Sequence, residues 1–336
     1  MTTKTVTEAA AAEKQAVTKR SWPLWKKLTI AGVTLTVIIA LSVGLGVGLT
    51  RGKASHDDEP EPELKRSVTT RASLWKPKVG TPWQIVLRQP IKLDDNGEAE
   101  GLKPDVAIYD LDMYDNDAET FAALHDAGRR VICYFSAGSW ENWRTDKNEF
   151  KKQDMGKTLD GWPDEKWLNL SSPSVRNIMK KRIKLAAQKG CDAIDPDNVD
   201  GYQNDNGLGL TQADSISYVK FLSAEAAKYN MSTGLKNAGD IIESVLPYVA
   251  FSVNEQCVNY EECETFAAFI KAGKPVFNIE YPKGAPKVKD TDRKTICSQK
   301  GKAAGTKGFS IVIKNLNLDG WVMYCTGKKY ETVLES

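Results

Sequence analysis

The feature that most constrains the fold is the alternation, from Trp83 onward, of short apolar runs with longer amphipathic segments. The short runs are rich in β-branched and aromatic residues, as buried strands are, and the longer segments carry apolar residues at helical spacing. Several of the longer segments end at glycine, which helix C-termini prefer. Eight strands that alternate with helices in a domain of this length predict an α/β fold, a (β/α)8 barrel of the TIM type.

The predicted strands are short and evenly distributed along this part of the chain. They begin at Trp83, Val106, Arg130, Ala193, Ser232, Phe251, Pro275 and Gly308. The clearest predicted helices cover residues 118–129, 174–190, 213–230 and 263–274. An open doubly wound sheet is the alternative, but such a sheet usually has a glycine-rich turn after its first strand. Because residues 87–101 contain no G-x-G-x-x-G motif, the barrel is favoured.

Residues 28–50 contain no charged side chain, and they predict a transmembrane helix. At ~1.5 Å per residue such a run crosses the ~30 Å hydrocarbon core. A cleaved signal peptide is the alternative, although its apolar region usually has only ~7–15 residues. Lysines and an arginine precede the run and acidic residues follow it. This charge bias predicts a single-pass type II protein of the plasma membrane, with residues 1–27 in the cytosol. We expect residues 51–78 to form a flexible stalk and residues 79–336 an extracellular domain.

Composition excludes several classes of function. The 46 Lys and Arg against 44 Asp and Glu leave the chain almost neutral, so we expect no nucleic-acid partner. The only histidines are His56 and His125. A Ser-His-Asp nucleophile system or a histidine zinc site is therefore not expected. The spacing of Asp195, Asp197 and Asp200 departs from that of an EF-hand calcium loop, and we predict no metal and no cofactor.

Acidic and polar residues follow the ends of most predicted strands. In a (β/α)8 barrel the carboxyl ends of the strands form the functional face, so these side chains should converge on one mouth. Any single aspartate there could instead cap a helix, but a cluster of like charges requires a function or a counter-charge such as Lys236. Polar residues predicted to bind substrate at this mouth are Asp110, Asp112, Asp195, Asn198, Asp200, Lys236 and Glu280.

Paired carboxyl groups and aromatic side chains at one mouth indicate glycoside hydrolysis. This reaction needs one ionised and one protonated carboxyl group across the sugar bond, and Asp197 and Glu255 could face each other in this way. Tyr134, Trp140 and Tyr202 could stack on sugar rings. Trp143 could stack in the same way, whereas Trp162 and Trp167 fit a role as loop anchors as well as a sugar-binding role.

Five sequence blocks in order carry a family resemblance: "RVICYFSAGSWENWR", "GCDAIDPDNVDGYQN", "GLKN", "VNEQCVNYEEC" and "AGKPVFNIEY". They resemble the endo-α-1,4-polygalactosaminidases, glycoside hydrolase family 114, and with the anchor they are similar to its fungal, membrane-anchored type. The resemblance implies a barrel hydrolase that cleaves internal α-1,4 bonds of galactosamine polymers such as galactosaminogalactan, with retention. It implies Asp197 as the nucleophile and Glu255 as the general acid/base.

The implied substrate fits the residues at the mouth, because a de-acetylated galactosamine polymer is cationic and acidic side chains would attract it. Two other functions stay open. One is a catalytically silent lectin that holds a cationic polysaccharide at the cell surface. The other is a hydrolase of another α-linked galactose or amino-sugar glycan.

Six cysteines, an even number, all lie in the predicted extracellular domain and indicate oxidising surroundings. Cys257 and Cys263 are close in sequence and form the favoured disulfide, although six cysteines allow fifteen connectivities. Further pairs that we consider are Cys133 with Cys191 and Cys297 with Cys325. The sequons at Asn169 and Asn230 are candidate glycosylation sites.

Overall fold

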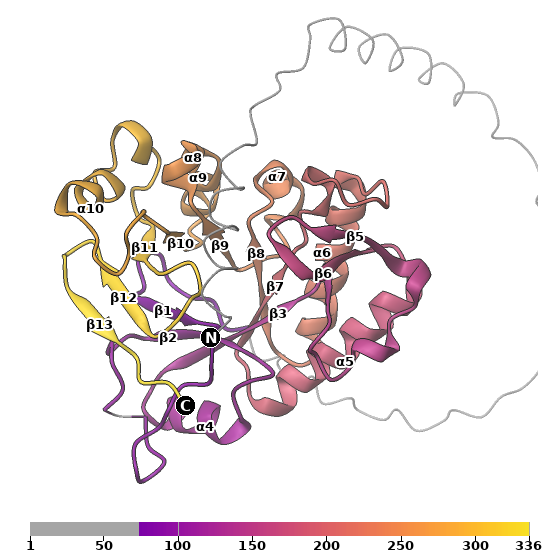
Figure 1. The fold of residues 1–336 in the computed structure, drawn as a ribbon, viewed down its shortest axis with the longest axis horizontal. Helices are drawn as coiled ribbons and strands as arrows, with labels where there is room; N and C mark the ends of the chain where they lie inside the picture. Colours follow the sequence, from indigo (N-terminus) through magenta and orange to yellow (C-terminus); the bar gives the residue numbers. More distant parts are fainter. Residues whose placement is uncertain (1–73, 100, 336) are drawn as a thin grey trace, which may run out of the picture. The chain divides into compact units, whose positions relative to one another are not determined.

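The computed structural model describes residues 74–99 and 101–335, and all eight predicted strands are present as neighbours in one parallel array (Figure 1). Nearly all residues of these strands, polar ones included, are buried, as in a parallel sheet that is covered on both faces. The parallel strands are β1 (Trp83–Val86), β2 (Ile108–Asp112), β3 (Arg130–Ser136), β7 (Ala193–Asp197), β8 (Ser232–Lys236), β9 (Phe251–Glu255), β10 (Val276–Glu280) and β11 (Ser310–Ile313).

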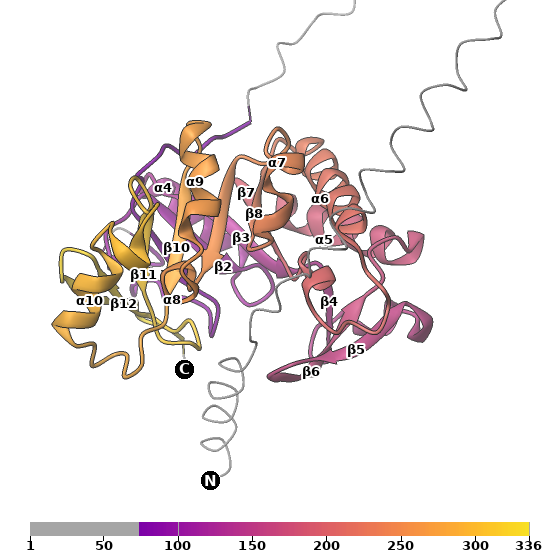
Figure 2. The ribbon, with the colours of Figure 1, turned by 90° about the horizontal axis from the view of Figure 1, so that it is seen from above.

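Helices cover the outer face of this array, and the four predicted helices correspond to α4, α5, α6 and α9 (Figures 1 and 2). The longest, α5, has Pro173 in its first turn and ends at Gly190, whose φ of 95° suits glycine. The helices are α4 (Ala118–Asp126), α5 (Pro173–Lys189), α6 (Gln212–Ala227), α7 (Ile242–Val245), α8 (Cys257–Tyr260), α9 (Cys263–Lys271) and α10 (Asp290–Ile296). Short 3₁₀ helices of one turn each are η2 (Lys147–Glu149), η3 (Lys152–Asp154), η4 (Gly201–Gln203), η5 (Gly239–Ile241) and η6 (Gly301–Ala303).

The sheet curls in the manner of a TIM-type barrel. Its first and last parallel strands, β1 and β11, are not paired by a backbone ladder as the other neighbouring strands are. After β11 the sheet continues antiparallel into β12 (Trp321–Tyr324) and β13 (Lys329–Glu331). Side chains connect β1 to this region: Trp83 Nε1 donates to the Ser310 carbonyl oxygen at 2.9 Å, and Lys314 Nζ donates to Gln84 Oε1 at 3.1 Å. Within the described residues, side-chain hydrogen bonds thus take the place of a β1–β11 backbone ladder.

A second sheet, which the sequence analysis treated as a loop, follows β3. It has three antiparallel strands in the order β4 (Ser139–Glu141), β6 (Trp162–Leu168), β5 (Met155–Leu159). Trp167 is buried under this sheet as a packing residue, whereas Trp143 and Trp162 are exposed. Only one face of this small sheet is covered, so its strands carry many polar residues and do not form the apolar runs that predict a buried strand.

The barrel contains two apolar cores separated by the strands. One lies inside the barrel and includes Ile108, Ile132 and Phe277; the other lies between the strands and the helices. Alternation along each strand divides the side chains between the two, because successive residues point to opposite faces. Trp75, from the predicted stalk, packs against the interior core.

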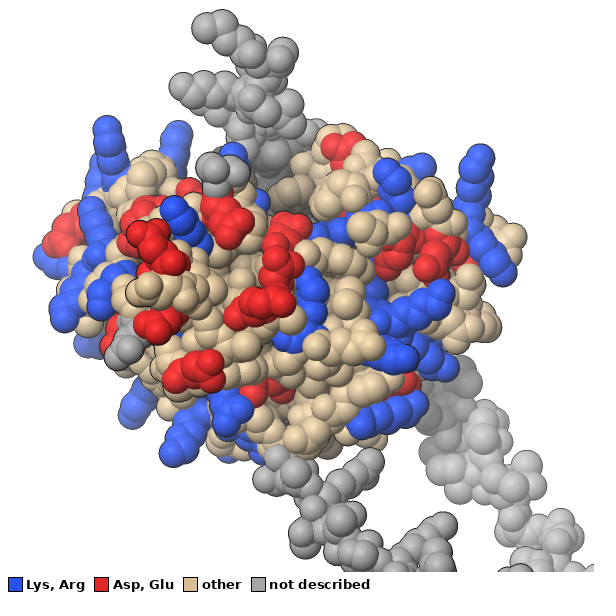
Figure 3. All heavy atoms as spheres, turned by 90° about the horizontal axis from the view of Figure 1, so that it is seen from below, with Lys and Arg blue, Asp and Glu red and all other residues tan. Residues whose placement is uncertain are grey.

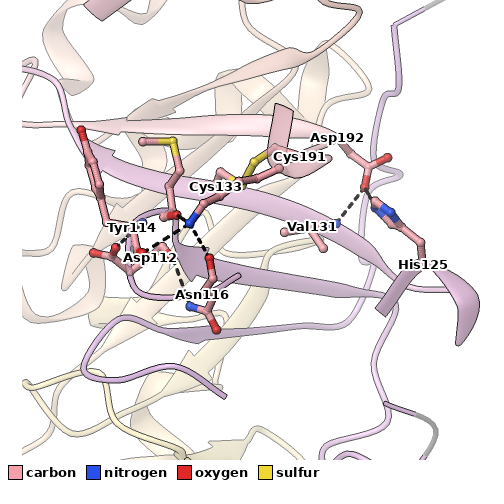
Figure 4. Close-up of a disulfide and its surroundings, with 10 residues drawn as sticks. Asp112, Tyr114, Asn116, His125, Val131, Cys133, Cys191 and Asp192 are labelled. Carbon is pink, nitrogen blue, oxygen red and sulfur yellow. Dashed lines mark hydrogen bonds and ion pairs between the residues drawn. A yellow bond between two sulfur atoms is a disulfide. The ribbon is translucent and has the colours of Figure 1, made fainter. Parts of the chain in front are cut away.

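Three disulfides join the pairs considered in the sequence analysis: Cys257–Cys263, Cys133–Cys191 and Cys297–Cys325. Figure 4 shows Cys133 of β3 linked to Cys191 just before β7. Next to this bond, Asp192 accepts a hydrogen bond from the Val131 N–H at 2.9 Å, and its Oδ2 lies 2.8 Å from His125 Nε2. This link between α4 and the segment before β7 gives His125 a structural role.

In the described residues, no helix is both long and apolar enough to cross a membrane. The predicted span at residues 28–50 lies outside them, as do the cytosolic tail and most of the stalk. Of the two candidate glycosylation sites, Asn230 is exposed, and Asn169 is partly buried with its Oδ1 accepting the Ser171 N–H at 3.1 Å. Their modification stays a prediction.

Candidate active site

The centre of the site is a lysine that lies between two carboxylates from different strands. Lys236, at the end of β8, places its Nζ 3.1 Å from Asp197 Oδ1 and 3.5 Å from Glu255 Oε2. Asp197 is the last residue of β7 and Glu255 the last residue of β9, and β8 lies between these two strands. Parallel pairing therefore brings the two predicted catalytic acids together at one end of the barrel.

Neutral donors complete the hydrogen bonding of these two carboxylates. The Tyr134 hydroxyl donates to Asp197 Oδ2 at 2.9 Å. The Tyr281 hydroxyl donates to Glu255 Oε1 at 2.6 Å, and Asn237 Nδ2 donates to Glu255 Oε2 at 3.1 Å. Each carboxylate is thus oriented by one phenol and by the shared ammonium.

The protonation states of these donors follow from their surroundings. Burial alone would lower the pKa of Lys236, but the charges of Asp197 and Glu255 outweigh burial and hold it well above its usual value. Burial and the Asp197 charge raise the pKa of Tyr134, and burial and the Glu255 charge raise the pKa of Tyr281. At neutral pH, Lys236 is therefore an ammonium and both tyrosines are phenols that can donate.

A second pair of carboxyl groups lies deeper in the barrel. Asp110 and Asp195 have no exposed surface, and none of their four side-chain oxygens has a hydrogen-bond partner among the described residues. Burial, together with the neighbouring Asp195, raises the pKa of Asp110 well above its usual value. Burial likewise raises the pKa of Asp195 to about 7, against the opposing effect of Lys236. Such groups favour the protonated form.

The rim of the site on the β7 side is formed by Asn198 and Asp200. Asn198 has a φ of 61°, and its Nδ2 donates to Ser136 Oγ at 2.9 Å and to Ser139 Oγ at 3.1 Å. Gly138 allows this arrangement, since a Cβ there would lie 1.7 Å from the Asn198 carbonyl oxygen. Asp200 is partly exposed, and burial with the nearby Asp197 charge raises its pKa to about 6.

Comparison with known proteins identifies the family. The model of glycoside-hydrolase family GH114 matches residues 65–330 of this chain. The chain belongs to glycoside-hydrolase family GH114. The GH114 domain is similar to a crystal structure of Aspergillus fumigatus Ega3 in complex with galactosamine, with 54% identity and a TM-score of 0.70. That match covers 75% of this chain and 98% of Ega3. The family expected from the sequence blocks, and with it the assignment to the glycoside hydrolases, is confirmed.

Two more distant proteins are also similar to the chain. The glycoside hydrolase domain of PelA from Pseudomonas aeruginosa shares the fold, with a TM-score of 0.52 at 11% identity over 70% of this chain and 95% of that domain. An uncharacterized protein of Deinococcus radiodurans is 25% identical over 197 residues, which are 51% of this chain. The matched part is 63% of that protein, less than two thirds of its length.

Four acids predicted to bind substrate lie away from the mouth of the GH114 domain. Asp110 and Asp195 are in the deeper layer, where a side chain with no exposed surface cannot contact a polymer. Asp112 is 2% exposed and forms a two-pronged ion pair with Arg144, at 3.0 and 2.6 Å. Glu280 is also 2% exposed and points outward from β10. Burial accounts for Asp110 and Asp195, the Arg144 ion pair for Asp112, and the outward face of β10 for Glu280; the residue types at the strand ends did not reveal these differences.

The remaining predicted residues fall into two groups. Tyr134, Asn198, Asp200 and Lys236 lie around the two catalytic candidates, as expected. Tyr202 is partly buried and accepts a hydrogen bond from Gln203 Nε2 at 3.3 Å. Trp140 belongs to β4; its Nε1 donates to the Lys147 carbonyl oxygen at 3.0 Å, and Lys166 Nζ lies 5.8 Å from the ring centre.

Two residues of the site were missed by the sequence analysis. One is Tyr281, although the alternation of side chains from Phe277 along β10 predicts that it faces the interior of the barrel. Glu165 of β6 accepts a hydrogen bond from Ser139 Oγ at 2.6 Å, and burial raises its pKa to about 7, with the Asp197 charge contributing. No signal in the sequence indicated Glu165, because it reaches the site through the unpredicted second sheet.

Charged side chains of both signs cover the outer surface. In Figure 3 an elongated acidic patch lies near the middle of the face shown, and many lysine and arginine side chains project from its rim. Among the described residues, no group of three or more His, Cys, Asp or Glu side chains is arranged to hold a metal ion.

Proposed function

We propose that this protein is an endo-acting glycoside hydrolase that cleaves internal α-1,4 bonds of de-acetylated galactosamine polymers such as galactosaminogalactan. The observation that carries the proposal is the pair Asp197 and Glu255, held by one ammonium at the carboxyl ends of barrel strands. Membership of GH114 and the similarity to Ega3, whose crystal structure contains galactosamine, support this substrate class.

In the first step, an Asp197 carboxylate oxygen attacks the anomeric carbon and forms a glycosyl ester. The bond from that carbon to the leaving oxygen breaks, and Glu255 transfers its proton to the leaving oxygen. In the second step, Glu255 takes a proton from water while the water oxygen attacks the anomeric carbon, and the carboxylate of Asp197 is released. Two successive inversions retain the configuration of the sugar.

The neighbouring groups suit these roles. Tyr134 and Lys236 both donate to Asp197, so they fix the carboxylate that attacks and stabilise it after release. Tyr281 and Asn237 orient Glu255 toward the same space. Because all four donors are held by the barrel, little reorganisation is needed during the reaction.

The spacing of the two acids supports retention. Asp197 Oδ1 and Glu255 Oε2 lie 3.1 and 3.5 Å from the same nitrogen, so their separation cannot exceed the sum of these distances. Retaining enzymes hold their carboxyl groups ~5–5.5 Å apart, whereas inverting enzymes need ~6.5–9.5 Å to admit a water molecule. The upper bound reaches only the short end of the inverting range.

The proposal is tested by Asp197→Asn and Glu255→Gln in the folded domain. Each variant should lose activity on partly de-acetylated galactosaminogalactan by about 10³-fold or more, read as oligomers by mass spectrometry. Asp205→Asn and Glu149→Gln are matched controls, because both acids form surface ion pairs with lysines. Polymer that is bound but uncut by the wild type would favour a lectin, and hydrolysis of only a different α-linked glycan would change the substrate.

The two roles can be separated with azide, which can replace a missing carboxylate. In Glu255→Ala the azide should attack the glycosyl ester and give a glycosyl azide of retained configuration. In Asp197→Ala it should attack the substrate directly and give the inverted azide. An inverted azide from Glu255→Ala and a retained azide from Asp197→Ala would show that Glu255 is the nucleophile and Asp197 the general acid/base.

We further propose that residues 28–50 anchor the protein in the plasma membrane with its catalytic domain outside. The uncharged run, the preceding basic residues and the following acidic residues support this topology. In cells that express the full chain, an external protease should remove the catalytic domain while an N-terminal tag stays protected. Protection of the catalytic domain in intact cells would refute the orientation.

A further inference from the structure

The one-turn helix α8 begins two residues after Glu255 and is held at both ends. Gln256 before it and Glu261 after it have left-handed φ values of 59° and 60°. The disulfide Cys257–Cys263 joins its first residue to the start of α9. A helix of this length is not stable alone, so tertiary contacts and the crosslink define its position.

A buried carboxylate from the neighbouring strand also holds α8. Glu280 of β10 accepts a hydrogen bond from the Val258 N–H at 2.9 Å and another from Asn278 Nδ2 at 3.0 Å. Burial raises the pKa of Glu280 to about 7, so placing it here costs free energy. Glu280, which was predicted to line the mouth, therefore lies on the outer side of β10 and holds the helix that follows Glu255.

Tyr260 is the aromatic residue of this fixed turn, and it is exposed, as is Asn259. Its side chain is 42% exposed although its backbone N–H is bonded to the Gln256 carbonyl oxygen at 2.9 Å. Burial of part of the ring raises its pKa, and the charges of Glu262 and Glu255 act on it in the same direction. Because α8 directly follows the carboxyl end of β9, Tyr260 lies at the same end of that strand as Glu255, whereas Asp197 is two strands away on β7.

We propose that Tyr260 is a sugar-stacking residue for the polymer unit on the leaving-group side of the cleaved bond. An exposed aromatic ring on a rigid support offers an apolar face to the C–H groups of a pyranose, and little entropy is lost when it binds. Glu255, the group that protonates the leaving oxygen in the proposed function on which this inference rests, is the nearer of the two catalytic carboxylates in the chain. The unit attached to that oxygen is thus the one that meets Tyr260.

The test compares Tyr260→Ala with Tyr248→Ala, a matched control. Tyr248 is 48% exposed, but it precedes β9 and so lies at the opposite end of that strand from Glu255. Tyr260→Ala should raise KM for the polymer about three- to ten-fold and change kcat by less than about two-fold. Tyr260→Phe should resemble the wild type, because stacking needs the ring and not the hydroxyl. Equal KM values for the two alanine variants would overturn the proposal.

Binding measured without hydrolysis separates this inference from the proposed function. In the Glu255→Gln background, calorimetry with a galactosamine oligomer should show about three- to ten-fold weaker binding when Tyr260 is also replaced by alanine. If the wild type hydrolyses the polymer but this Kd does not change, the stacking role is wrong and the hydrolase assignment stands. If the wild type does not hydrolyse it, the leaving-group assignment falls with the proposed function.

Discussion

Asp195 and Asp197 lie two residues apart on the same strand and on the same side of it, yet their surroundings differ completely. Asp197, at the mouth, has bonds from Tyr134 and Lys236. Asp195, one layer deeper, has no hydrogen-bond partner among the described residues and no exposed surface. Two positions along one strand therefore separate a carboxylate that accepts two hydrogen bonds from a buried carboxyl group that favours its proton.

This comparison shows that position relative to Lys236 and solvent, more than residue type, decides what each acid can do. A partly exposed carboxylate next to an ammonium is suited to attack or to exchange a proton. A buried carboxyl group without partners instead contributes to the electrostatics of the interior and makes stability depend on pH. The mouth and the layer beneath it can be tested separately.

Among the variants that test this comparison, the largest effect on activity should come from removing the shared ammonium. Lys236→Met should reduce kcat/KM by about 10²–10³-fold, because Asp197 and Glu255 then face each other without a cation. Lys157→Met is the control, since Lys157 forms an exposed pair with Asp205 at 2.6 Å. Steady-state kinetics on the polymer measures both variants. A loss of less than ten-fold in Lys236→Met would show that the ammonium is not what makes the carboxylates at the mouth reactive.

A smaller effect should follow the loss of one neutral donor at the mouth. Tyr281→Phe removes the hydroxyl that donates to Glu255 Oε1 at 2.6 Å and should lower kcat by about ten-fold. Tyr248→Phe, at an exposed position, should leave kcat unchanged. An unchanged kcat in Tyr281→Phe would mean that Glu255 is oriented adequately by its other neighbours.

The smallest expected effect is a change in the free energy of unfolding when Asp195, in the deeper layer, is replaced. The pKa of Asp195 is raised to about 7, so between its ordinary value and 7 the native state binds more protons than the unfolded state. The free energy of unfolding should therefore fall as pH rises from about 4 through 7. Asp195→Asn should weaken this dependence and be more stable than the wild type above pH 7 by on the order of 1 kcal/mol.

Denaturant unfolding at a series of pH values measures this difference. Asp205→Asn is the control, because Asp205 is exposed and paired with Lys157. Parallel curves for the wild type and Asp195→Asn over this range would show that Asp195 does not carry the proton. The dependence that remains in Asp195→Asn would belong to groups such as Asp110.

Much of the fold followed from periodicity. Within the described residues, every predicted strand and helix is present near its predicted position, because segments such as that from Phe251 are buried on both faces. The second sheet and the β12–β13 extension were missed, since their short strands carry mixed polar and apolar residues. The three disulfides match the pairs considered, but only the spatial proximity of the strands selects them among fifteen connectivities.

The amino-acid pattern alone was enough to predict the strands, the family and the two acids that meet at the mouth. These depend on local patterns and on the rule that parallel strands end at the same face. The folded chain was needed to show that Lys236 lies between those acids, that Asp112 pairs with Arg144, and that Glu280 points outward. Such contacts join residues far apart in the chain, and a shift of one residue along a strand reverses the face that a side chain occupies.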